Sequence, residues 1–475
     1  MLMKTKKRRL EQFLFYDYTG IEAHLAKMAM KGWQIYKITP FYWEYRRIEP
    51  QKLTYTVTYF SEASDFNPYP TENQLAFHDY CEEAGWKLVT QWAQMQIFCA
   101  TRENPTPIET DEALKLKAIH KSMKKNFLPS SIALLLLSLF QIYFQFHLGV
   151  RSPVDFLSNG TTLSSIVIWG ILALYMLTNL TVYAVWYQRS RKAASRGETG
   201  IESGSRYRKA QIVWLLLEGI AVTGMLLSLS SQYFELMGVW LIAYTALILI
   251  VLAIRNALKR TGTSRNTNIL ITVISVVVLA LVLTGFLTRG ITRSVNAGRL
   301  GRQPAETYTI TRPNGTTHTW EIYHDTLPLT VEDLQDVDYD HYSYMWTARE
   351  SFLLGQYVAR QSALPDGRQA PELSYTIVDV KLPALYDICL NHYLGRYDDW
   401  DADAPVEKKR YFQETNGPAW KADRVYQLHI QEETRAEYIL CWGSRIVSIH
   451  FDEAPTTQQI AIAVEKLTDY EGGTR

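Results

Sequence analysis

Several catalytic motifs are missing from this 475-residue sequence. It has no Walker loop with Gly-Lys-Ser/Thr, no Gly-x-Gly-x-x-Gly, no Gly-x-Ser-x-Gly and no His-Glu-x-x-His. These motifs hold nucleotide phosphates, dinucleotides, a serine nucleophile or a catalytic zinc ion. Their absence argues against ATP-driven transport and zinc proteolysis, so we expect no catalytic residues and no cofactor.

Cysteine is also scarce. The sequence has four cysteines and no Cys-x-x-Cys, which excludes a disulfide scaffold and a thioredoxin-like redox motif. Cys389 and Cys441 could form one disulfide in an oxidising medium, and the sequence leaves this open. His341 follows Asp340, but no second histidine comes at a spacing suited to zinc, so we expect no metal site.

Acidic residues are rare in the middle of the chain. Residues 1–126 carry 18 basic and 15 acidic side chains, residues 127–289 carry 13 and 5, and residues 290–475 carry 18 and 28, which gives net charges of +3, +8 and −10. Averages over the whole chain hide this segregation. The sequence therefore divides into an N-terminal α+β domain (1–108), a basic juxtamembrane helix (109–126), a membrane block (127–289) and an acidic C-terminal α+β domain (303–475).

Five long apolar stretches form the membrane block. A helix needs about 20 residues to cross a hydrocarbon core of about 30 Å. Buried helices of a soluble domain would show a polar stripe, but the last stretch has only Thr272, Ser275 and Thr284 as polar side chains. No cleavable signal sequence is expected before them. We predict a five-helix transmembrane bundle at residues 127–148, 163–187, 211–229, 236–254 and 269–287.

Lysine and arginine predict the orientation, because they resist translocation and stay on the cytoplasmic side. They are concentrated between spans two and three (residues 188–210) and between spans four and five (residues 255–268), whereas residues 149–162 contain only Arg151 and residues 230–235 contain none. The N-terminal domain is then cytoplasmic and the C-terminal domain extracytoplasmic. Four arginines beyond the last span argue against this, but reversing the orientation would require removing one span.

Glu218 is the acidic side chain that lies deep within a predicted span, and Asn179 lies at a similar depth in the preceding span. The two could hydrogen-bond as a structural clamp across a helical hairpin. Alternatively, Glu218 could serve as a proton or ligand site, since intramembrane carboxylates are often functional, or could face water. Too few other polar residues share the membrane block to outline a translocation path.

The N-terminal domain shows an internal repeat. In each half a helical pattern, at residues 21–31 and 72–84, ends at a glycine that is followed by tryptophan and a strand-like run. Further strands are expected at residues 13–18, 43–47, 53–60 and 94–101. The resulting β-α-β-β-β-α-β-β order favours a ferredoxin-like sheet with two helices on one face.

The two helix-Gly-Trp units, Gly32-Trp33 and Gly85-Trp86, together with the aromatic strand Tyr55-Thr56-Val57-Thr58-Tyr59 and the following spans, resemble the bacterial family called domain of unknown function 2812. The resemblance covers about residues 10–125. It implies a bacterial membrane protein without an assigned activity, often encoded beside PadR-type transcription regulators. It transfers no catalytic residues to this sequence.

The N-terminal domain is rich in aromatic residues, a feature shared with sheets that stack nucleotide bases. However, it is nearly neutral and its sequence shows no basic stripe for phosphate contacts, so we expect no nucleic acid as a partner. A surface for a cytoplasmic protein partner, or plain core packing, explains the aromatics better. The lysines of residues 115–125 should face anionic membrane lipids.

The C-terminal domain has a pattern of a mainly antiparallel sheet. Strands are expected at residues 307–312, 316–323, 351–360, 373–380, 425–430, 438–442 and 446–451. Helices are expected from Pro383 to about Leu394 and after the capping residue Thr456. Its two acidic runs, residues 332–340 and 398–403, both fail the calcium-loop pattern at the glycine and glutamate positions, so they are expected to be solvated loops, or to bind a cation weakly or a cationic peptide.

The architecture favours a non-enzymatic sensor or regulator, in which an outside event such as binding of a cationic peptide changes how the cytoplasmic domain engages a partner. This rests on analogy with other membrane receptors rather than on a site. A transport or immunity component that uses Glu218, and a membrane-embedded enzyme, are the alternatives. The sequence does not indicate the ligand, the partner or the oligomeric state.

Overall fold

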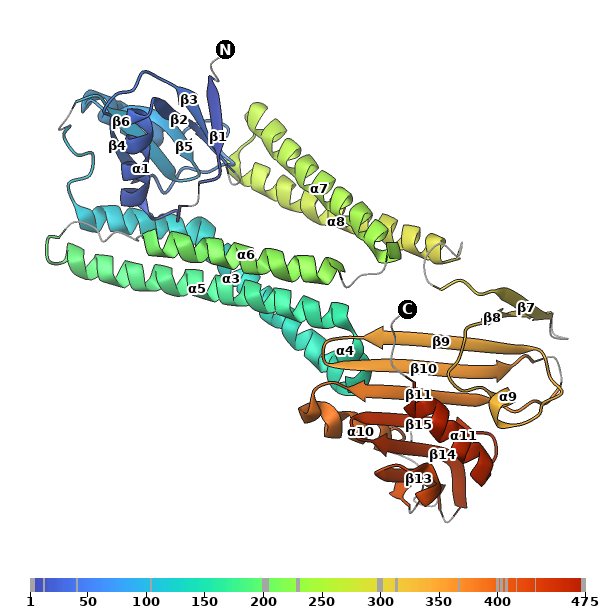
Figure 1. The fold of residues 1–475 in the computed structure, drawn as a ribbon. Helices are drawn as coiled ribbons and strands as arrows, with labels where there is room; N and C mark the ends of the chain where they lie inside the picture. Colours follow the sequence, from blue (N-terminus) through green and yellow to red (C-terminus); the bar gives the residue numbers. More distant parts are fainter. Residues whose placement is uncertain are drawn as a thin grey trace. The chain divides into compact units, whose positions relative to one another are not determined.

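The computed structural model describes most of the chain as two compact units (Figure 1). One unit comprises Met1–Gln141, Val167–Leu226 and Ser230–Arg293, and the other comprises Ile142–Ile166, Leu227–Leu229 and Ser294–Arg475. The described residues are 5–11, 13–39, 42–102, 105–198, 205–227, 231–296, 302–311, 315–365, 368–398, 401, 405, 409–415, 417–431 and 433–470.

The N-terminal part of the first unit, up to residue 111, is called the head here. Its elements follow the order predicted from the sequence, with one exception at the start. The expected strand at residues 13–18 is wrong, because Asp17 instead caps the first helix. The elements are β1 (Lys6–Arg9), α1 (Tyr18–Met30), β2 (Trp33–Ile38), β3 (Trp43–Arg47), β4 (Thr54–Tyr59), α2 (Glu72–Glu83), β5 (Lys87–Trp92) and β6 (Met95–Ala100).

The head contains the same three-stranded sheet twice. The strand orders are β1-β3-β2 and β4-β6-β5, and all neighbouring strands are antiparallel. Each βαββ repeat is thus a split β-α-β unit with a third strand inserted, and β2 of the first lies beside β5 of the second. The internal repeat is confirmed, but the expected single ferredoxin-like sheet is wrong in its strand arrangement. Hydrogen-bonded pairing stops at the boundary between the repeats.

Equivalent signals delimit the helix of each repeat. The Asp17 carboxylate accepts a hydrogen bond from the Gly20 amide at 3.2 Å, and the Thr71 hydroxyl accepts one from the Gln74 amide at 3.3 Å. At the other ends, Gly32 and Gly85 have φ angles of +77° and +87°. Side chains rarely adopt this conformation, which explains the glycine before each tryptophan.

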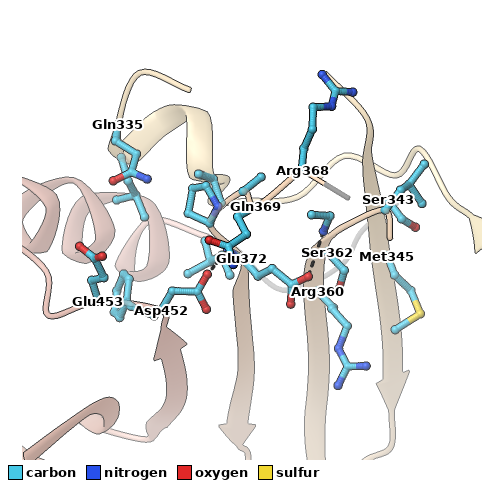
Figure 2. A pocket seen from close by; sticks show the side chains of 18 of the residues that line it. Gln335, Ser343, Met345, Arg360, Ser362, Arg368, Gln369, Glu372, Asp452 and Glu453 are labelled. Carbon is cyan, nitrogen blue, oxygen red and sulfur yellow. Dashed lines mark hydrogen bonds between the residues drawn. The ribbon is translucent and has the colours of Figure 1, made fainter. Parts of the chain in front are cut away.

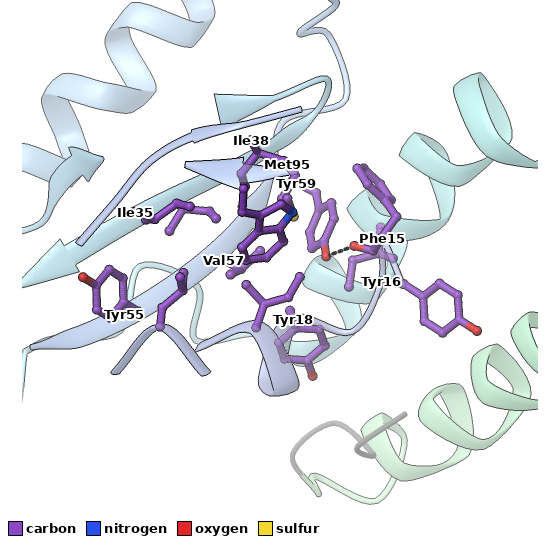
Figure 3. Packing of buried hydrophobic residues seen from close by; sticks show 14 of the residues in the cluster. Phe15, Tyr16, Tyr18, Ile35, Ile38, Tyr55, Val57, Tyr59 and Met95 are labelled. Atoms are coloured by element: carbon purple, nitrogen blue, oxygen red, sulfur yellow. Dashed lines mark hydrogen bonds between the residues drawn. The ribbon is translucent and has the colours of Figure 1, made fainter. Parts of the chain in front are cut away.

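The core of the head includes residues from the long helices of the same unit. Figure 3 shows the centre of this core, where the Tyr59 hydroxyl donates to the Phe15 carbonyl. Ile119 on α3 (Glu112–Arg151) and Trp186 on α5 (Gly160–Ala194) belong to the same buried cluster. The head is therefore packed onto these helices.

Four helices in the described residues are long and apolar enough to cross a membrane. They are α3, α5, the Gly238–Arg260 part of α7 (Ser231–Arg260) and the Arg265–Ser294 part of α8 (Arg265–Asn296). The predicted number was five. The remaining helix, α6 (Ser205–Leu227), has a shorter apolar part, Ala210–Leu226, and residues 228–230 at the end of the predicted span lie outside the described residues.

The long helices expose their apolar side chains. At most 6% of the most apolar window of any of the four is buried within the structure. Leu136, Phe140, Leu241 and Leu281, for example, are 58–71% exposed. An apolar surface of this extent is typical of helices that face lipid, so the chain has the character of a multi-pass membrane protein.

The second unit is built on a seven-stranded antiparallel sheet of order β12-β13-β14-β15-β11-β10-β9. The predicted strands and helices are present, and β9 and β12 were not predicted. The sheet strands are β9 (Tyr342–Glu350), β10 (Leu354–Ala363), β11 (Leu373–Val380), β12 (Arg410–Glu414), β13 (Arg424–Ile430), β14 (Glu433–Trp442) and β15 (Arg445–Phe451).

The remaining elements of the second unit pack around this sheet. Strands β7 (Glu306–Thr311) and β8 (Thr317–Ile322), both predicted, pair antiparallel as a separate two-stranded sheet. Two buried clusters lie in the unit, one with α11 (Thr457–Thr468) and one with α10 (Tyr386–Leu394). Short helices complete it: α4 (Pro153–Ser158), α9 (Val331–Leu334), η1 (Pro383–Leu385) and η3 (Pro418–Trp420).

Candidate functional site

The connection between α3 and α5 is a folded part of the C-terminal domain. It contains α4, which begins at Pro153 and which was not predicted between the first two spans. Val154 is 1% exposed and lies in the same buried cluster as Leu354 of β10 and Cys389 of α10. Burial of a valine side chain contributes about 1.5–3 kcal/mol, so this apolar contact is substantial.

Hydrogen bonds hold α4 in this position, which is called the α4 seat here. The Asp155 carboxylate accepts from the Arg349 guanidinium and from the Gln356 amide, both at 3.0 Å. The Ser158 hydroxyl donates to the Gln356 side-chain oxygen at 3.1 Å, and the Ser351 hydroxyl donates to the carbonyl of residue 157 at 2.6 Å. Polar and apolar contacts thus both attach α4 to β10 and its preceding turn.

In the first unit, an aromatic cluster joins the head to α3 and α5. The Tyr16 ring centroid lies 5.1 Å from that of Tyr183 and 4.6 Å from that of Trp186. His120 on α3 stacks on Tyr187 at 4.2 Å, and its Nδ1 lies 2.7 Å from the Tyr183 hydroxyl. Aromatic pairs of this kind contribute about 0.5–1.5 kcal/mol each beyond their buried area.

Asn179 and Glu218 do not form the predicted clamp. The Asn179 amide nitrogen donates to the Tyr175 carbonyl at 3.0 Å, and its oxygen accepts from the Tyr207 hydroxyl of α6 at 2.5 Å. A polar link between α5 and α6 therefore exists, but Tyr207 makes it. Asn179 and Glu218 were expected to pair because they lie at similar depths, but Asn179 is 15 residues before the end of α5 and Tyr207 is only the third residue of α6, so the two helices are offset along their length.

Glu218 is half-buried on α6. Its Oε2 atom has no hydrogen-bond partner among the described residues. An unpartnered carboxylate on an apolar helix is costly when charged, so this side chain remains a candidate for a function that the structure does not identify.

The two Gly-Trp units place their tryptophans in different surroundings. Trp86 is 4% exposed, and its Nε1 donates to the Thr106 carbonyl at 2.7 Å. Trp33 is only partly buried, and the cationic groups of Lys7 and Arg47 lie 5.4 and 5.2 Å from its ring centroid. The predicted structural role fits Trp86 well, whereas Trp33 also supports charged groups at the surface.

A charged cluster is enclosed where α1 meets the start of α3. The Glu22 carboxylate accepts from the Val57 amide at 2.7 Å, and the Lys115 ammonium lies 3.9 Å from the Tyr18 ring centroid. Burial raises the pKa of Glu22 and of Glu109, and the charge of Lys115 opposes this effect on both. No local sequence pattern predicts this cluster, since its members are far apart along the chain.

A groove of about 1110 Å³ lies in the second unit, where β10 ends and β11 begins (Figure 2). Its other walls come from α9, β8 and the turn between β15 and α11. The Glu372 carboxylate accepts from the Ala363 amide at 3.1 Å, and Asp452 accepts from the Glu372 amide at 2.6 Å. Its charged lining residues are Glu321, Glu372, Asp452, Glu453, Arg360 and Arg368, an excess of two carboxylates.

The predicted acidic runs are partly engaged in ion pairs. Asp333 contacts Lys466 at 2.9 Å, and Asp401 contacts Arg410 at 2.8 Å, while residues 399, 400 and 402–404 lie outside the described residues. Within the described part of the chain no group of three or more metal-binding side chains occurs. Cys389 and Cys441 share a buried cluster but are both free thiols, and burial raises the pKa of Cys389 to about 11.

Strand β1 was missed because its sequence, Lys-Lys-Arg-Arg, contains no apolar residue. It nevertheless pairs with β3 over its whole length, and all four of its side chains are exposed. The statement that the head has no basic stripe is therefore wrong. The prediction that no nucleic acid binds there was based on it and remains a prediction.

With this geometry in place, the chain can be compared with known proteins. Residues 17–130 match the family model described as protein of unknown function (DUF2812). The resemblance inferred from the Gly-Trp units is confirmed. The DUF2812 region covers most of the head, including both helices and β2 to β6, and extends into α3. No curated protein and no solved structure matches the chain.

Proposed function

We propose that the protein is a non-enzymatic membrane regulator in which the α3–α5 hairpin couples a C-terminal sensing domain to the head. One observation carries this proposal: residues of the same hairpin belong to the core of each unit. Ile119 and Trp186 lie in the core of the head, and Val154 lies in a core of the C-terminal domain. A change at the α4 seat therefore acts on helices that the head is packed against.

Five transmembrane helices are part of this proposal. Four are supported by length and composition, and α6 would be the fifth. Its apolar part of 17 residues is about 25 Å long at a rise of about 1.5 Å per residue, so it needs slight local thinning of the bilayer.

The proposed orientation has the head in the cytoplasm and the C-terminal domain outside. Contacts within each unit support it. The head binds segments near the Lys- and Arg-rich connections: Lys125 donates to the Ser61 carbonyl at 2.7 Å, and Asn268 donates to the Phe66 carbonyl at 3.2 Å. The C-terminal domain instead holds α4, which lies in a connection with few basic residues.

In this proposal the acidic groove of the second unit receives the external signal. Its excess of carboxylates suits a cationic peptide, and its lining by β9 and β10 suits an extended chain. On the other side, the head would engage a cytoplasmic protein. The exposed lysines before the first span, Lys117, Lys121 and Lys124, would contact anionic lipids, whereas Lys115 is buried against the head.

Cysteine labelling of intact cells tests the orientation. The native cysteines are buried, so single substitutions at exposed sites can be read without removing them. We expect Glu465→Cys on α11 to react with a membrane-impermeant maleimide from outside, and Tyr69→Cys, at a side chain 70% exposed in the head, to react only after permeabilisation. The reverse pattern would refute the proposed orientation.

Hydrogen exchange tests the coupling. In the full chain reconstituted in nanodiscs, Val154→Ala and Gln356→Ala should loosen the α4 seat and raise exchange near His120 and Tyr183. Tyr411→Ala, at an exposed side chain of the same domain that does not line the groove, is the matched control. Unchanged exchange in the head after both seat substitutions would remove the basis of the regulator proposal.

A transport or immunity role that uses Glu218 is the second candidate, because the Oε2 atom of Glu218 has no partner in the described residues. Glu218→Gln distinguishes the two. The transport reading expects loss of the cellular phenotype with the C-terminal domain intact, whereas the regulator proposal expects the phenotype to persist.

A further inference from the structure

Strand β1 forms one edge of the first sheet of the head. Its pairing partner is β3, with Lys6 opposite Arg46 and Arg9 opposite Trp43, and the described residues place no strand on its other side. An unpaired edge offers a row of amide and carbonyl groups to another chain.

The direction of these groups follows from the register. The Arg47 amide donates to the Thr5 carbonyl at 3.0 Å, which makes Thr5 and Arg47 a hydrogen-bonded pair. Because such pairs alternate in an antiparallel ladder, Lys7 and Arg9 also bond towards β3. The backbone groups of Lys6 and Arg8 therefore point outwards.

Both faces of this edge carry cations held over aromatic rings. On one face, Lys6 and Arg46 lie 5.8 and 3.2 Å from the Tyr36 ring centroid, and Arg8 lies 4.8 Å from that of Tyr42. On the other face, Lys7 and Arg47 are over Trp33. These contacts fix the positions of charged groups that would otherwise be mobile.

The local carboxylates leave most of this charge uncompensated. Glu44 pairs with Lys6 at 3.4 Å and with Arg8 at 3.2 Å, and Glu11 pairs with Arg9 at 2.9 Å. Strands β1, β2 and β3 together have seven basic and one acidic side chain, a net charge of +6.

We propose that β1 is the docking edge for an extended acidic segment of a soluble protein, which adds to the sheet as a fourth strand. The side chains of an added strand alternate between the two faces, and each face of β1 presents cations to them. This proposal gives the chemistry of the head's partner and rests on the proposed function for the statement that the head meets soluble proteins.

The presence of cations on both faces is what favours a strand over other anionic partners. A membrane surface or a nucleic acid would contact one face and leave the cations of the other unused. An added strand uses both faces together with the outward backbone groups of Lys6 and Arg8.

The first test is direct binding to the full chain in detergent. The probe is a fluorescent peptide with a run of glutamates flanked by threonine and valine. A peptide of the same sequence that is N-methylated at alternate residues keeps the charge but cannot pair as a strand. We expect the unmodified peptide to bind and the methylated peptide to bind about tenfold more weakly or not at all.

A matched pair of variants separates backbone pairing from charge. Arg8→Gln removes one cation, and Arg8→Pro removes the same cation and the outward amide, without removing a hydrogen bond to β3. We expect Arg8→Pro to bind the peptide about fivefold more weakly than Arg8→Gln. Hydrogen exchange of β3 confirms that both variants keep the sheet.

A second pair tests the use of both faces. The double variants Lys6→Gln with Arg46→Gln and Lys7→Gln with Arg47→Gln each remove two cations, from opposite faces. We expect each to weaken peptide binding about threefold or more. If only one pair has an effect, the partner contacts one face and the strand model is wrong.

Other outcomes overturn the proposal as well. Equal binding of the methylated peptide, equal effects of the two Arg8 variants, or tighter binding of single-stranded DNA or of anionic vesicles would each show that β1 is not a strand-pairing edge. The assay uses solubilised protein and needs neither a membrane orientation nor a signal. Its failure is therefore distinguishable from failure of the maleimide and coupling experiments.

Discussion

The two βαββ repeats of the head share a topology but differ in how they use it. Strands β1, β2 and β3 carry a net charge of +6, whereas β4, β5 and β6 carry only one lysine, a net charge of +1. All side chains of β1 are exposed, whereas its counterpart in the second repeat, β4, has four buried side chains.

Some features of the head are the same in both repeats and others are not. The caps, the positive-φ glycines and the strand order recur, because they depend on local backbone requirements. The surroundings of Trp33 and Trp86 do not recur, because they depend on which face of each sheet is covered. Both repeats contribute to the core, and they differ most at their first strands, where β1 presents charge to the surface and β4 is largely buried.

The largest expected difference concerns the two tryptophans. Trp86→Ala should destabilise the head by about 3–5 kcal/mol, because it opens a cavity in a buried cluster. Trp33→Ala should cost about 1–2 kcal/mol, since it removes a partly exposed ring and two cation–π contacts. Opening free energies from hydrogen exchange of β2 and β6 in the full chain check this. Equal costs for the two substitutions would contradict the different burial described for Trp33 and Trp86.

For the two glycines, the substitution in the first repeat should have the larger free-energy cost. A Cβ at Gly32 would lie 2.9 Å from the Ile48 carbonyl oxygen, so Gly32→Ala combines a backbone clash with the left-handed φ and should cost about 2–3 kcal/mol. At Gly85 the nearest atom is 3.9 Å away, on the flexible side chain of Arg102, and Gly85→Ala should cost about 1 kcal/mol. The same exchange measurement applies. A larger loss at Gly85 would contradict the packing described for Gly32.

The helix caps should behave alike in both repeats. Asp17→Ala and Thr71→Ala each remove one side-chain hydrogen bond to a helix amide, and each should cost about 1 kcal/mol. Exchange of the first-turn amides of α1 and α2 reports the loss. Asp17→Asn and Thr71→Ser keep the cap and serve as controls, and should restore most of the protection.

A pH dependence should come from the enclosed cluster that contains Glu22 of the first repeat and Glu109. Burial raises the pKa of Glu22 above its usual value of 4.5, so the folded head binds this proton more tightly than the unfolded chain does. The resulting stability is fully present below about pH 4.5 and is lost as the pH rises through the raised pKa. Exchange of the Val57 amide, corrected for its intrinsic rate, should show this slope, and Glu22→Gln should reduce it to the part that Glu109 contributes. An unchanged slope in Glu22→Gln would assign it to another group.

Local signals made much of the head predictable. The glycine that ends each helix and the tryptophan that follows located β2, and alternating aromatics located β4. By contrast, β1 has no apolar side chain, and its pairing depends on Glu44 and aromatic rings that come later in the sequence. The arrangement of six strands as two sheets likewise depends on long-range packing.

The candidate sites were less predictable. Asn179 was identified as a clamp residue, but its partner Tyr207 could not be found without the true helix ends. Helix α4 is short, and its apolar residues around Val154 do not by themselves predict burial. Their burial depends on contacts with Leu354 and Cys389, which come much later in the sequence. The groove combines residues from β8 to α11, so no contiguous motif marks it.

The α4 seat gives the C-terminal domain two attachments to the rest of the chain, one covalent, through the segment between α8 and β7, and one through folded contacts. A single proteolytic cut between α8 and β7 would consequently nick the protein without shedding the domain. The domain would be released only when α4 dissociates from its seat. The fraction of domain released after such a cut would therefore report the stability of the α4 contacts.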